Sequence, residues 1–218
     1  MRRLAPVLSA LALAGCGGGD DEAEPTTATG GAGEGGCRET TEPQPKPEGT
    51  LQAPDELLDA ATEHRVVVET SCGSFTIVLD PAGAPRAAAS FAALAEDGFY
   101  DGTVFHRIVP GFVIQGGDPT GTGFGGPGYT TVDPPAGGTT YPRGAVAMAK
   151  AGPDPAGTAG SQFFVVTRDA GLPPDYAVIG RVTEGIEAVD RIEALGDATT
   201  ELPTRPVVVD RMTYEPGK

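Results

Sequence analysis

The amino-acid sequence predicts a mainly β domain, built as a barrel or a sandwich with few helices. Many short runs rich in Val, Ile, Phe and Tyr are separated by turn residues, as in the strands of an antiparallel sheet. The 33 glycines and 21 prolines of the 218-residue chain place many residues in turns. Only two stretches repeat apolar residues with the period of a helix. About eight strands and two helices are therefore expected, a proportion typical of barrels and sandwiches.

The expected strands follow one another along the chain. They cover residues 66–69, 75–79, 104–109, 112–114, 145–149, 162–167, 176–182 and 207–214. The first two are separated by the turn sequence Ser-Cys-Gly-Ser and should form a hairpin, and the next two flank a Pro-Gly turn. Residues 119–143 are dense in Gly, Pro and Thr, so we expect a long loop there.

Two helices are expected between these strands. The first covers residues 85–97, because Pro85 suits the first turn of a helix and Gly98 suits its end. The second has one apolar face, made of Ile186, Val189, Ile192 and Leu195.

The N-terminus has the pattern of a targeting segment, residues 1–15. Two arginines precede an apolar run, residues 4–14, that is too short to span a bilayer as a helix and is typical of a signal peptide. The run ends in small residues before Cys16, which resembles the lipobox of bacterial lipoproteins. We expect cleavage before Cys16 and attachment of lipid to its sulfur. An ordinary secretory signal with an incidental cysteine is the alternative.

Residues 16–64 are expected to form a lipidated, disordered linker before the folded domain of residues 65–216. Residues 17–36 contain eight glycines and five acidic residues but no Lys or Arg, so they bury too little apolar surface to fold. Four prolines stiffen residues 38–54 toward an extended conformation. In an exported protein, Cys37 and Cys72 are expected to form a disulfide that ties this linker to the domain.

Charge and motifs exclude several classes of function. A formal net charge of −15 argues against nucleic-acid binding, which needs a basic surface. Neither of the two histidines lies in the ligand spacing of a zinc hydrolase, and no Gly-x-Ser-x-Gly elbow of a serine hydrolase occurs. Residues 121–126 match Gly-x-Gly-x-x-Gly, but prolines rather than a helix follow, so no dinucleotide site is expected. No metal and no cofactor are predicted.

The candidate site combines two segments of unusual composition. Arg107 and Gln115 lie among large apolar residues in FHRIVPGFVIQGGDP, residues 105–119, and Gln162 precedes Phe163 and Phe164 in a second apolar run. Arginine rarely has an apolar surround unless it has a partner or a function. A structural salt bridge is the simpler interpretation of Arg107. One guanidinium, two amides and several aromatic rings, without a catalytic carboxylate or thiol, suit a reaction that needs no proton transfer.

These segments, together with AMAKAGPDPAGTAGSQFFVVT at residues 147–167, resemble the cyclophilin family of peptidyl-prolyl cis/trans isomerases. The resemblance covers about residues 65–214. It implies a closed, eight-stranded antiparallel barrel capped by two helices, with Arg107 as the catalytic hydrogen-bond donor and no cofactor. The residues that it implies for substrate binding are His106, Phe112, Val113, Gln115, Ala149, Lys150, Ala151, Gln162, Phe164, Leu172 and Tyr176. Lys150 is expected to place a positive charge at the rim of the groove.

The resemblance and the N-terminus together predict where and on what the protein acts. The expected activity is isomerisation of X-Pro bonds in exported proteins, which assists their folding. The expected partners are proline-containing polypeptide segments, with no nucleic acid, and the protein is expected to be a monomer. It is expected outside the cytoplasm, held to the bacterial cell membrane or envelope by its lipid anchor only. The alternative is a non-catalytic module of the envelope that binds proline-containing segments or acts as a chaperone.

Overall fold

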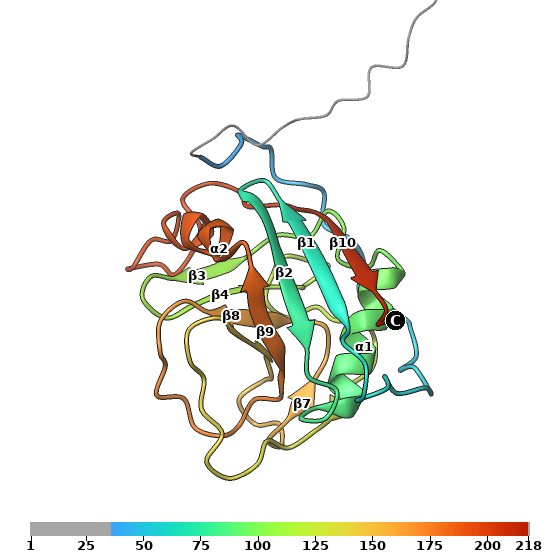
Figure 1. Ribbon diagram of the computed structural model, residues 1–218. Coiled ribbons are helices and arrows are strands. Elements are labelled where there is room, and N and C mark those ends of the chain that lie inside the picture. Colours follow the sequence, from blue (N-terminus) through green and yellow to red (C-terminus); the bar gives the residue numbers. More distant parts are fainter. Residues whose placement is uncertain (1–35, 218) are drawn as a thin grey trace, which may run out of the picture. The chain divides into compact units, whose positions relative to one another are not determined.

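Eight antiparallel strands form one curved sheet in the computed structural model, which describes residues 36–217 (Figure 1). The strands lie in the order β10-β1-β2-β9-β6-β8-β4-β3. Their bounds are β1 Arg65–Thr70, β2 Gly73–Leu79, β3 Arg107–Val109, β4 Val113–Gly116, β6 Ala145–Met148, β8 Phe163–Val166, β9 Val178–Glu184 and β10 Val209–Glu215. A small second sheet, which the sequence did not predict, pairs β5 (Thr131–Val132) with β7 (Thr158–Ala159).

The two edges of the large sheet meet through the residues that precede β3 and β10. Val104 forms an isolated antiparallel bridge with Val208, and the N–H of Phe105 donates to the oxygen of Val207 at 3.0 Å. The strand expected over residues 104–109 is therefore shorter. Val104 forms only isolated bridges, with Val208 and with Asp118, and the ladder with β4 begins at Arg107. The barrel fold with two helices is confirmed, with bridging segments rather than a continuous ladder where its edges meet.

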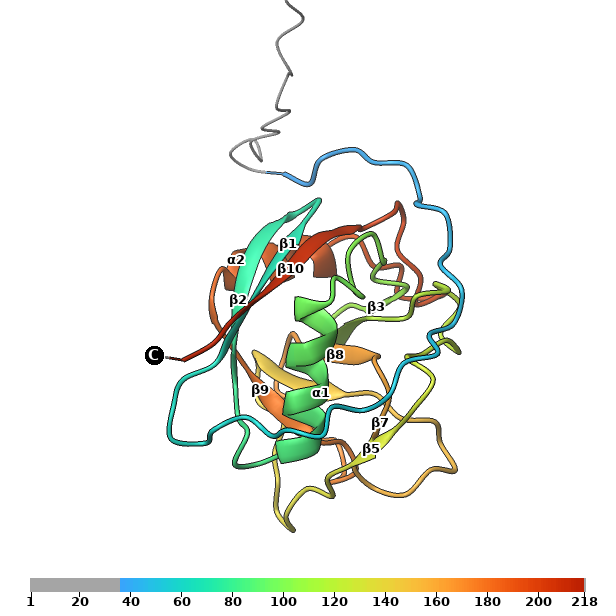
Figure 2. The same ribbon diagram turned by 90° about the vertical axis from the view of Figure 1, so that its right-hand side faces the viewer.

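The helices pack against the barrel core, the apolar cluster inside the curved sheet (Figure 2). Helix α1 (Pro85–Glu96) contributes Phe91, whose ring lies 5.2 Å from the ring of Phe163. Helix α2 (Ile186–Glu193) contributes Val189 and Ile192 to the same cluster. Both helices therefore lie where the sequence predicted them. No helix within residues 36–217 is long and apolar enough to cross a membrane.

Strands β4, β6 and β8 bury both of their faces. In β8, Phe163 and Val165 point into the barrel core, whereas Phe164 and Val166 belong to a second apolar cluster on the opposite face. This alternation is the period of two that a strand imposes on its side chains. We call the second set the outer cluster; its buried members are Val113, Tyr141, Ala145, Ala147, Phe164 and Val166.

The segment of residues 37–51, here called the N-terminal arm, differs from the predicted disordered linker. It runs along the outside of the domain (Figure 2). Its backbone N–H groups at Arg38, Lys46, Gly49 and Leu51 donate to the oxygens of Ser71, Pro119, Gly126 and Pro127, at 2.7 to 2.9 Å. The prolines of the arm pre-set an extended backbone, which lowers the entropic cost of laying it on a surface. The described part of the expected linker is therefore held on the domain from Cys37 onward.

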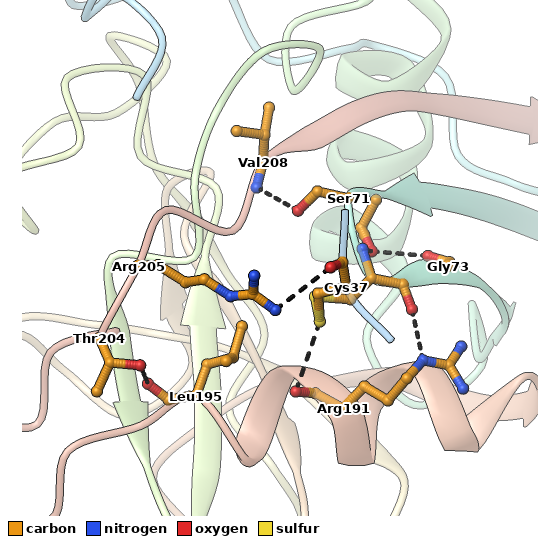
Figure 3. The surroundings of a disulfide bond; sticks show 10 residues. Cys37, Ser71, Gly73, Arg191, Leu195, Thr204, Arg205 and Val208 are labelled. Carbon is orange, nitrogen blue, oxygen red and sulfur yellow. Dashed lines mark hydrogen bonds between the residues drawn. A yellow bond between two sulfur atoms is a disulfide. The ribbon is translucent and has the colours of Figure 1, made fainter. Parts of the chain in front are cut away.

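The predicted disulfide between Cys37 and Cys72 is present and fixes the start of the arm, with an S–S distance of 2.02 Å. Figure 3 shows Cys37 between the β1–β2 turn and α2. Arg191 of α2 donates from Nε to the backbone oxygen of Cys72 at 2.8 Å, and Arg205 donates to that of Cys37 at 3.3 Å. The disulfide therefore joins the arm to the hairpin at a point that α2 also contacts.

Candidate active site

A groove lies over the outer cluster and has two adjoining compartments. The inner pocket has a volume of about 230 Å³, and its lining residues are Arg107, Phe112, Val113, Gln115, Ala149, Lys150, Phe164, Leu172 and Tyr176. The outer pocket, of about 700 Å³, shares Gln115, Ala149 and Lys150 with it and also contacts Ala151 and Gln162. Every residue that lines the inner pocket was predicted from the sequence as a site residue.

Strand register brings the central residues of the groove together. Arg107 of β3 pairs with Gln115 of β4, Gln115 pairs with Phe164 of β8, and Phe164 pairs with Ala147 of β6. Directly paired residues in an antiparallel sheet project to the same face. The guanidinium, the amide and the aromatic ring therefore form one row across three neighbouring strands, although 57 positions separate Arg107 from Phe164 in the sequence.

The apolar wall of the inner pocket is held in place by a buried tyrosine. The rings of Phe164 and Tyr176 lie 5.3 Å apart and nearly perpendicular, at 89°. Tyr141 donates its hydroxyl hydrogen to the backbone oxygen of Tyr176 at 2.9 Å and accepts the Tyr176 N–H at 3.1 Å. Burial raises the pKa of Tyr141, so the phenol keeps its proton. Sequence reasoning missed Tyr141, because it lies in the long loop and no local motif surrounds it.

A chain of hydrogen bonds runs along the polar side of the groove from Arg107. Its Nη1 donates to Oε1 of Gln115 at 3.4 Å, and Nε2 of Gln115 donates to Oε1 of Gln162 at 3.0 Å. Nε2 of Gln162 then donates to the backbone oxygen of Gly125 at 3.0 Å. At the other end, Nε of Arg107 donates to Oε2 of Glu201 at 2.8 Å. Arg107 thus forms a salt bridge and also lines the pocket, so the two interpretations of its role are compatible.

Lys150 differs from its prediction, because its charge is not free at the rim. Its side chain is 4% exposed, and Nζ lies 3.2 Å from a carboxylate oxygen of Asp175. Nζ also donates to the backbone oxygen of Asp154 at 3.0 Å. Lys150 therefore lines both pockets, but its buried ammonium group is paired with Asp175.

His106 is the predicted site residue that the structure places outside both pockets. Its two ring nitrogens are buried without a hydrogen-bond partner among the described residues, and its ring lies under Gly123. Burial lowers the pKa of His106, although nearby Asp118 acts in the opposite direction. Side chains alternate along an extended segment, so His106 points away from the face that carries Arg107.

The glycine-rich loop beside the groove surrounds a carboxylate of its own. The carboxylate of Asp118 accepts the backbone N–H groups of Thr120, Gly123 and Gly125 at 2.7, 2.5 and 3.1 Å. Burial raises the pKa of Asp118, but these hydrogen bonds and one from the Thr120 hydroxyl outweigh it and lower the pKa. These loop N–H groups are therefore occupied by the Asp118 carboxylate. Among residues 36–217, no three His, Cys, Asp or Glu side chains are grouped to hold a metal ion.

Comparisons with known proteins show which family the chain resembles. The family described as "Cyclophilin type peptidyl-prolyl cis-trans isomerase/CLD" matches residues 65–214. Peptidyl-prolyl cis-trans isomerase B of Bacillus subtilis is 50% identical over 111 residues, which are 50% of this chain and 76% of that protein. A putative bifunctional phosphatase/peptidyl-prolyl cis-trans isomerase of Streptococcus pyogenes is 48% identical over 119 residues, 53% of this chain but only 25% of that protein.

A solved structure agrees as well. It is a cyclophilin type peptidyl-prolyl cis-trans isomerase of Cryptosporidium parvum, determined in the presence of the dipeptide Ala-Pro. It superposes with a TM-score of 0.64 at 32% identity, and the match covers 69% of this chain and 98% of that chain. The chain therefore belongs to the cyclophilin-type peptidyl-prolyl cis-trans isomerases.

Proposed function

We propose that this isomerase assists the folding of exported proteins by rotating their X-Pro bonds in the groove, with Arg107 as the catalytic donor. The observation that carries the proposal is the row of Arg107, Gln115 and Phe164 across β3, β4 and β8. It places a charged donor, an amide and an apolar wall around one pocket of about 230 Å³. The substrates are segments with proline in an accessible, extended conformation.

The chemistry of the bond explains why such a set is sufficient. Resonance in the amide opposes rotation by about 18–20 kcal/mol, and uncatalysed exchange at X-Pro takes tens to hundreds of seconds. At the twisted transition state resonance is lost and the prolyl nitrogen gains a lone pair. A fixed donor aimed at that nitrogen binds the twisted form better than either planar form, which lowers the barrier.

Each part of the groove has a task in this scheme. The apolar side chains of Phe112, Phe164 and Leu172 hold the proline ring in a dehydrated site. Gln115 and Gln162 offer amide groups to the backbone on either side while the bond rotates. An arginine carries its charge at any physiological pH, so Arg107 is ready as a donor without proton transfer.

The exported location is part of the proposal. Cys16 lies outside the described residues, so its lipidation is a proposal from the sequence alone. The disulfide of Cys37 and Cys72 supports an oxidising compartment, since such bonds are rare in the cytoplasm. Fatty-acid labelling of the protein in cells should disappear in Cys16→Ser, and persistent label would refute the anchor. We propose that the protein acts on its substrates as a monomer held by the lipid anchor. Nucleic acid is not among its proposed partners.

The activity is tested with an X-Pro peptide whose cis-to-trans exchange is followed by NMR. A soluble form that starts at residue 17 should accelerate exchange far above the uncatalysed rate, and Arg107→Ala should lose most of this acceleration. An exchange rate no faster than the uncatalysed one, with peptide still bound, would favour the non-catalytic binding module. Equal rates for the two forms would reject the proposed mechanism.

A further inference from the structure

The turn that follows α2 contains the one backbone outlier among the described residues. Glu201 has a φ of 58°, and it is the only residue other than glycine with a positive φ between residues 36 and 217. This left-handed region is strained for a residue that has a Cβ atom, and glycine would relieve the strain. Strain of this kind is concentrated at functional sites, so the side chain of Glu201 is a candidate for a function.

Hydrogen bonds within the turn hold Glu201 in this conformation. Its N–H donates to the backbone oxygen of Asp197 at 2.8 Å, and the N–H of Asp197 donates to that of Leu202 at 3.0 Å. The carboxylate of Asp197 accepts the N–H groups of Thr199 and Thr200 at 2.8 and 2.9 Å. The bond from Thr200, followed by that from Thr199, lowers the pKa of Asp197, so this carboxyl stays ionised near neutral pH.

The turn is also docked on β3, next to Arg107. The N–H of Ile108 donates to the backbone oxygen of Glu201 at 2.9 Å. This is possible because β3 is the last strand of the sheet and has an unpaired edge. Gly196 packs directly on Ile108, where an added Cβ would lie 2.6 Å from Cγ2 of Ile108. The backbone of Glu201 is therefore fixed beside β3, and its carboxylate reaches the neighbouring guanidinium.

The carboxylate engages one defined side of that guanidinium. Nε of Arg107 donates to Oε2 of Glu201 at 2.8 Å, and Nη1 donates to Gln115 at 3.4 Å. Neither contact uses Nη2. A planar guanidinium held at two of its nitrogens has a defined plane, and its remaining donors point in a fixed direction. Arg107 lines the inner pocket, so those donors are available to a bound peptide.

We propose that Glu201 is a positioning residue, which sets the plane of the Arg107 guanidinium toward the prolyl nitrogen. This inference rests on the proposed role of Arg107. The side chains of Arg107 and Glu201 are 35% and 45% exposed, and ion pairs at such sites add little stability. The strained turn is thus better explained by orientation of the donor, to which catalysis is sensitive, than by stabilisation of the fold.

The test replaces the side chain while keeping the turn. Glycine accepts a φ of 58° without strain, so Glu201→Gly should unfold at the same or a higher temperature than the wild type. Its kcat/KM for an X-Pro peptide should nevertheless fall about tenfold, mainly in kcat, because the donor is misoriented in the transition state. Glu201→Gln keeps an acceptor for Nε and should lose less. The control is Glu184→Ala. This variant removes an exposed carboxylate of β9 that pairs with Arg65 of β1, and its kcat/KM should match that of the wild type.

Two measurements show whether Glu201 acts through Arg107. The Nε–H of Arg107 should give a protected NMR signal in the wild type that is lost or exchanges faster in Glu201→Gly. In an Arg107→Ala background, Glu201→Gly should slow the reaction no further.

Several results would overturn the proposal. One is an unchanged or increased kcat/KM in Glu201→Gly, and another is an Arg107 Nε–H signal that Glu201→Gly leaves unchanged. A third is that Glu201→Gly slows the reaction as much in the Arg107→Ala background as in the wild type. If Arg107→Ala itself keeps the wild-type rate, the proposed catalytic role of Arg107 fails instead, while the isomerase activity stands. If Arg107→Ala is inactive while Glu201→Gly matches the wild type, only the role of Glu201 is rejected.

Discussion

The two halves of the sheet bury their side chains differently. In β1 and β10, one face packs on the barrel core, and most residues on the other face are partly or fully exposed. In β6 and β8, every residue is buried, because one face packs in the barrel core and the other belongs to the outer cluster. Antiparallel sheets commonly leave one face to water. The half of the sheet with an apolar outer face is therefore the half that carries the groove.

We expect this difference to separate residues that maintain the fold from residues that contact substrate. Two residues that are adjacent in one strand fall on different faces, because side chains alternate between the inner and the outer face. Substitutions on the inner face should change stability first, and substitutions on the outer face should change binding and rate first. The predictions below test that separation, in order of decreasing expected effect.

Phe163 and Phe164 are adjacent in β8 and offer a matched pair. Phe163 is 0% exposed and contacts the rings of Phe91, Tyr100 and Phe105, so Phe163→Ala should cost about 3–5 kcal/mol of unfolding free energy. Phe164 is also buried, at 5% exposure, but it borders the groove instead of the barrel core, so we expect Phe164→Ala to cost less than Phe163→Ala. Urea unfolding and peptide KM measure the two effects. KM should rise in Phe164→Ala only, and equal KM values would contradict the separation of faces.

The disulfide lies in the half of the sheet away from the groove. It closes a loop between positions 35 apart, so Cys37→Ser with Cys72→Ser should lower the unfolding free energy by about 3–4 kcal/mol through loop entropy. In a domain of this size the unfolding temperature should fall by roughly 10 °C. The isomerase rate of the folded protein should stay within about twofold, as assayed well below that temperature. A rate loss as large as that of Arg107→Ala would show that the arm is part of the catalytic machinery.

The smallest predicted effect concerns pH and separates His106 from catalysis. Burial lowers the pKa of His106 in the folded state. As pH falls, the His106 ring is therefore protonated first in the unfolded chain, at about pH 6.5. The free energy of unfolding falls from there toward the lowered pKa of the folded state. Above pH 6.5 this stabilisation is complete. Between pH 7 and pH 5, the unfolding free energy measured with urea should fall more in the wild type than in His106→Gln.

The isomerase rate should respond differently, because Arg107 needs no proton transfer. Between pH 6 and pH 8 we expect kcat/KM to be nearly constant. A steep change that disappears in His106→Gln would place His106 in the reaction and contradict its position outside the pockets.

The sequence predicted those parts of the molecule that local patterns encode. The alternating runs around Pro110 and Phe163 defined the strands, and the apolar surround of Arg107 marked the site. The resemblance added Leu172 and Tyr176, which no local pattern would assign to the same pocket. What was missed depends on tertiary contacts. Glu201 reaches Arg107 across 94 positions, and its turn has no sequence signature that indicates this contact.

The errors have physical reasons of the same kind. The N-terminal arm has a composition typical of disorder, but a disulfide and backbone hydrogen bonds from residues 38 to 51 fix it on the domain. Lys150 was expected as a charge at the rim of the groove, yet its side chain is buried and paired with Asp175. His106 adjoins Arg107 in sequence, and because side chains alternate along an extended segment, His106 lies on the opposite face.

The most direct test of the account compares one residue from each half of the sheet in the same assay. Arg107→Ala should reduce kcat/KM for an X-Pro peptide by about 100-fold, while its unfolding free energy falls by less than about 1 kcal/mol. Ile77→Val, buried in β2, should lose about 1 kcal/mol of stability and keep the wild-type kcat/KM. A kcat/KM of Arg107→Ala equal to that of Ile77→Val would contradict the claim that the outer-face guanidinium catalyses the rotation.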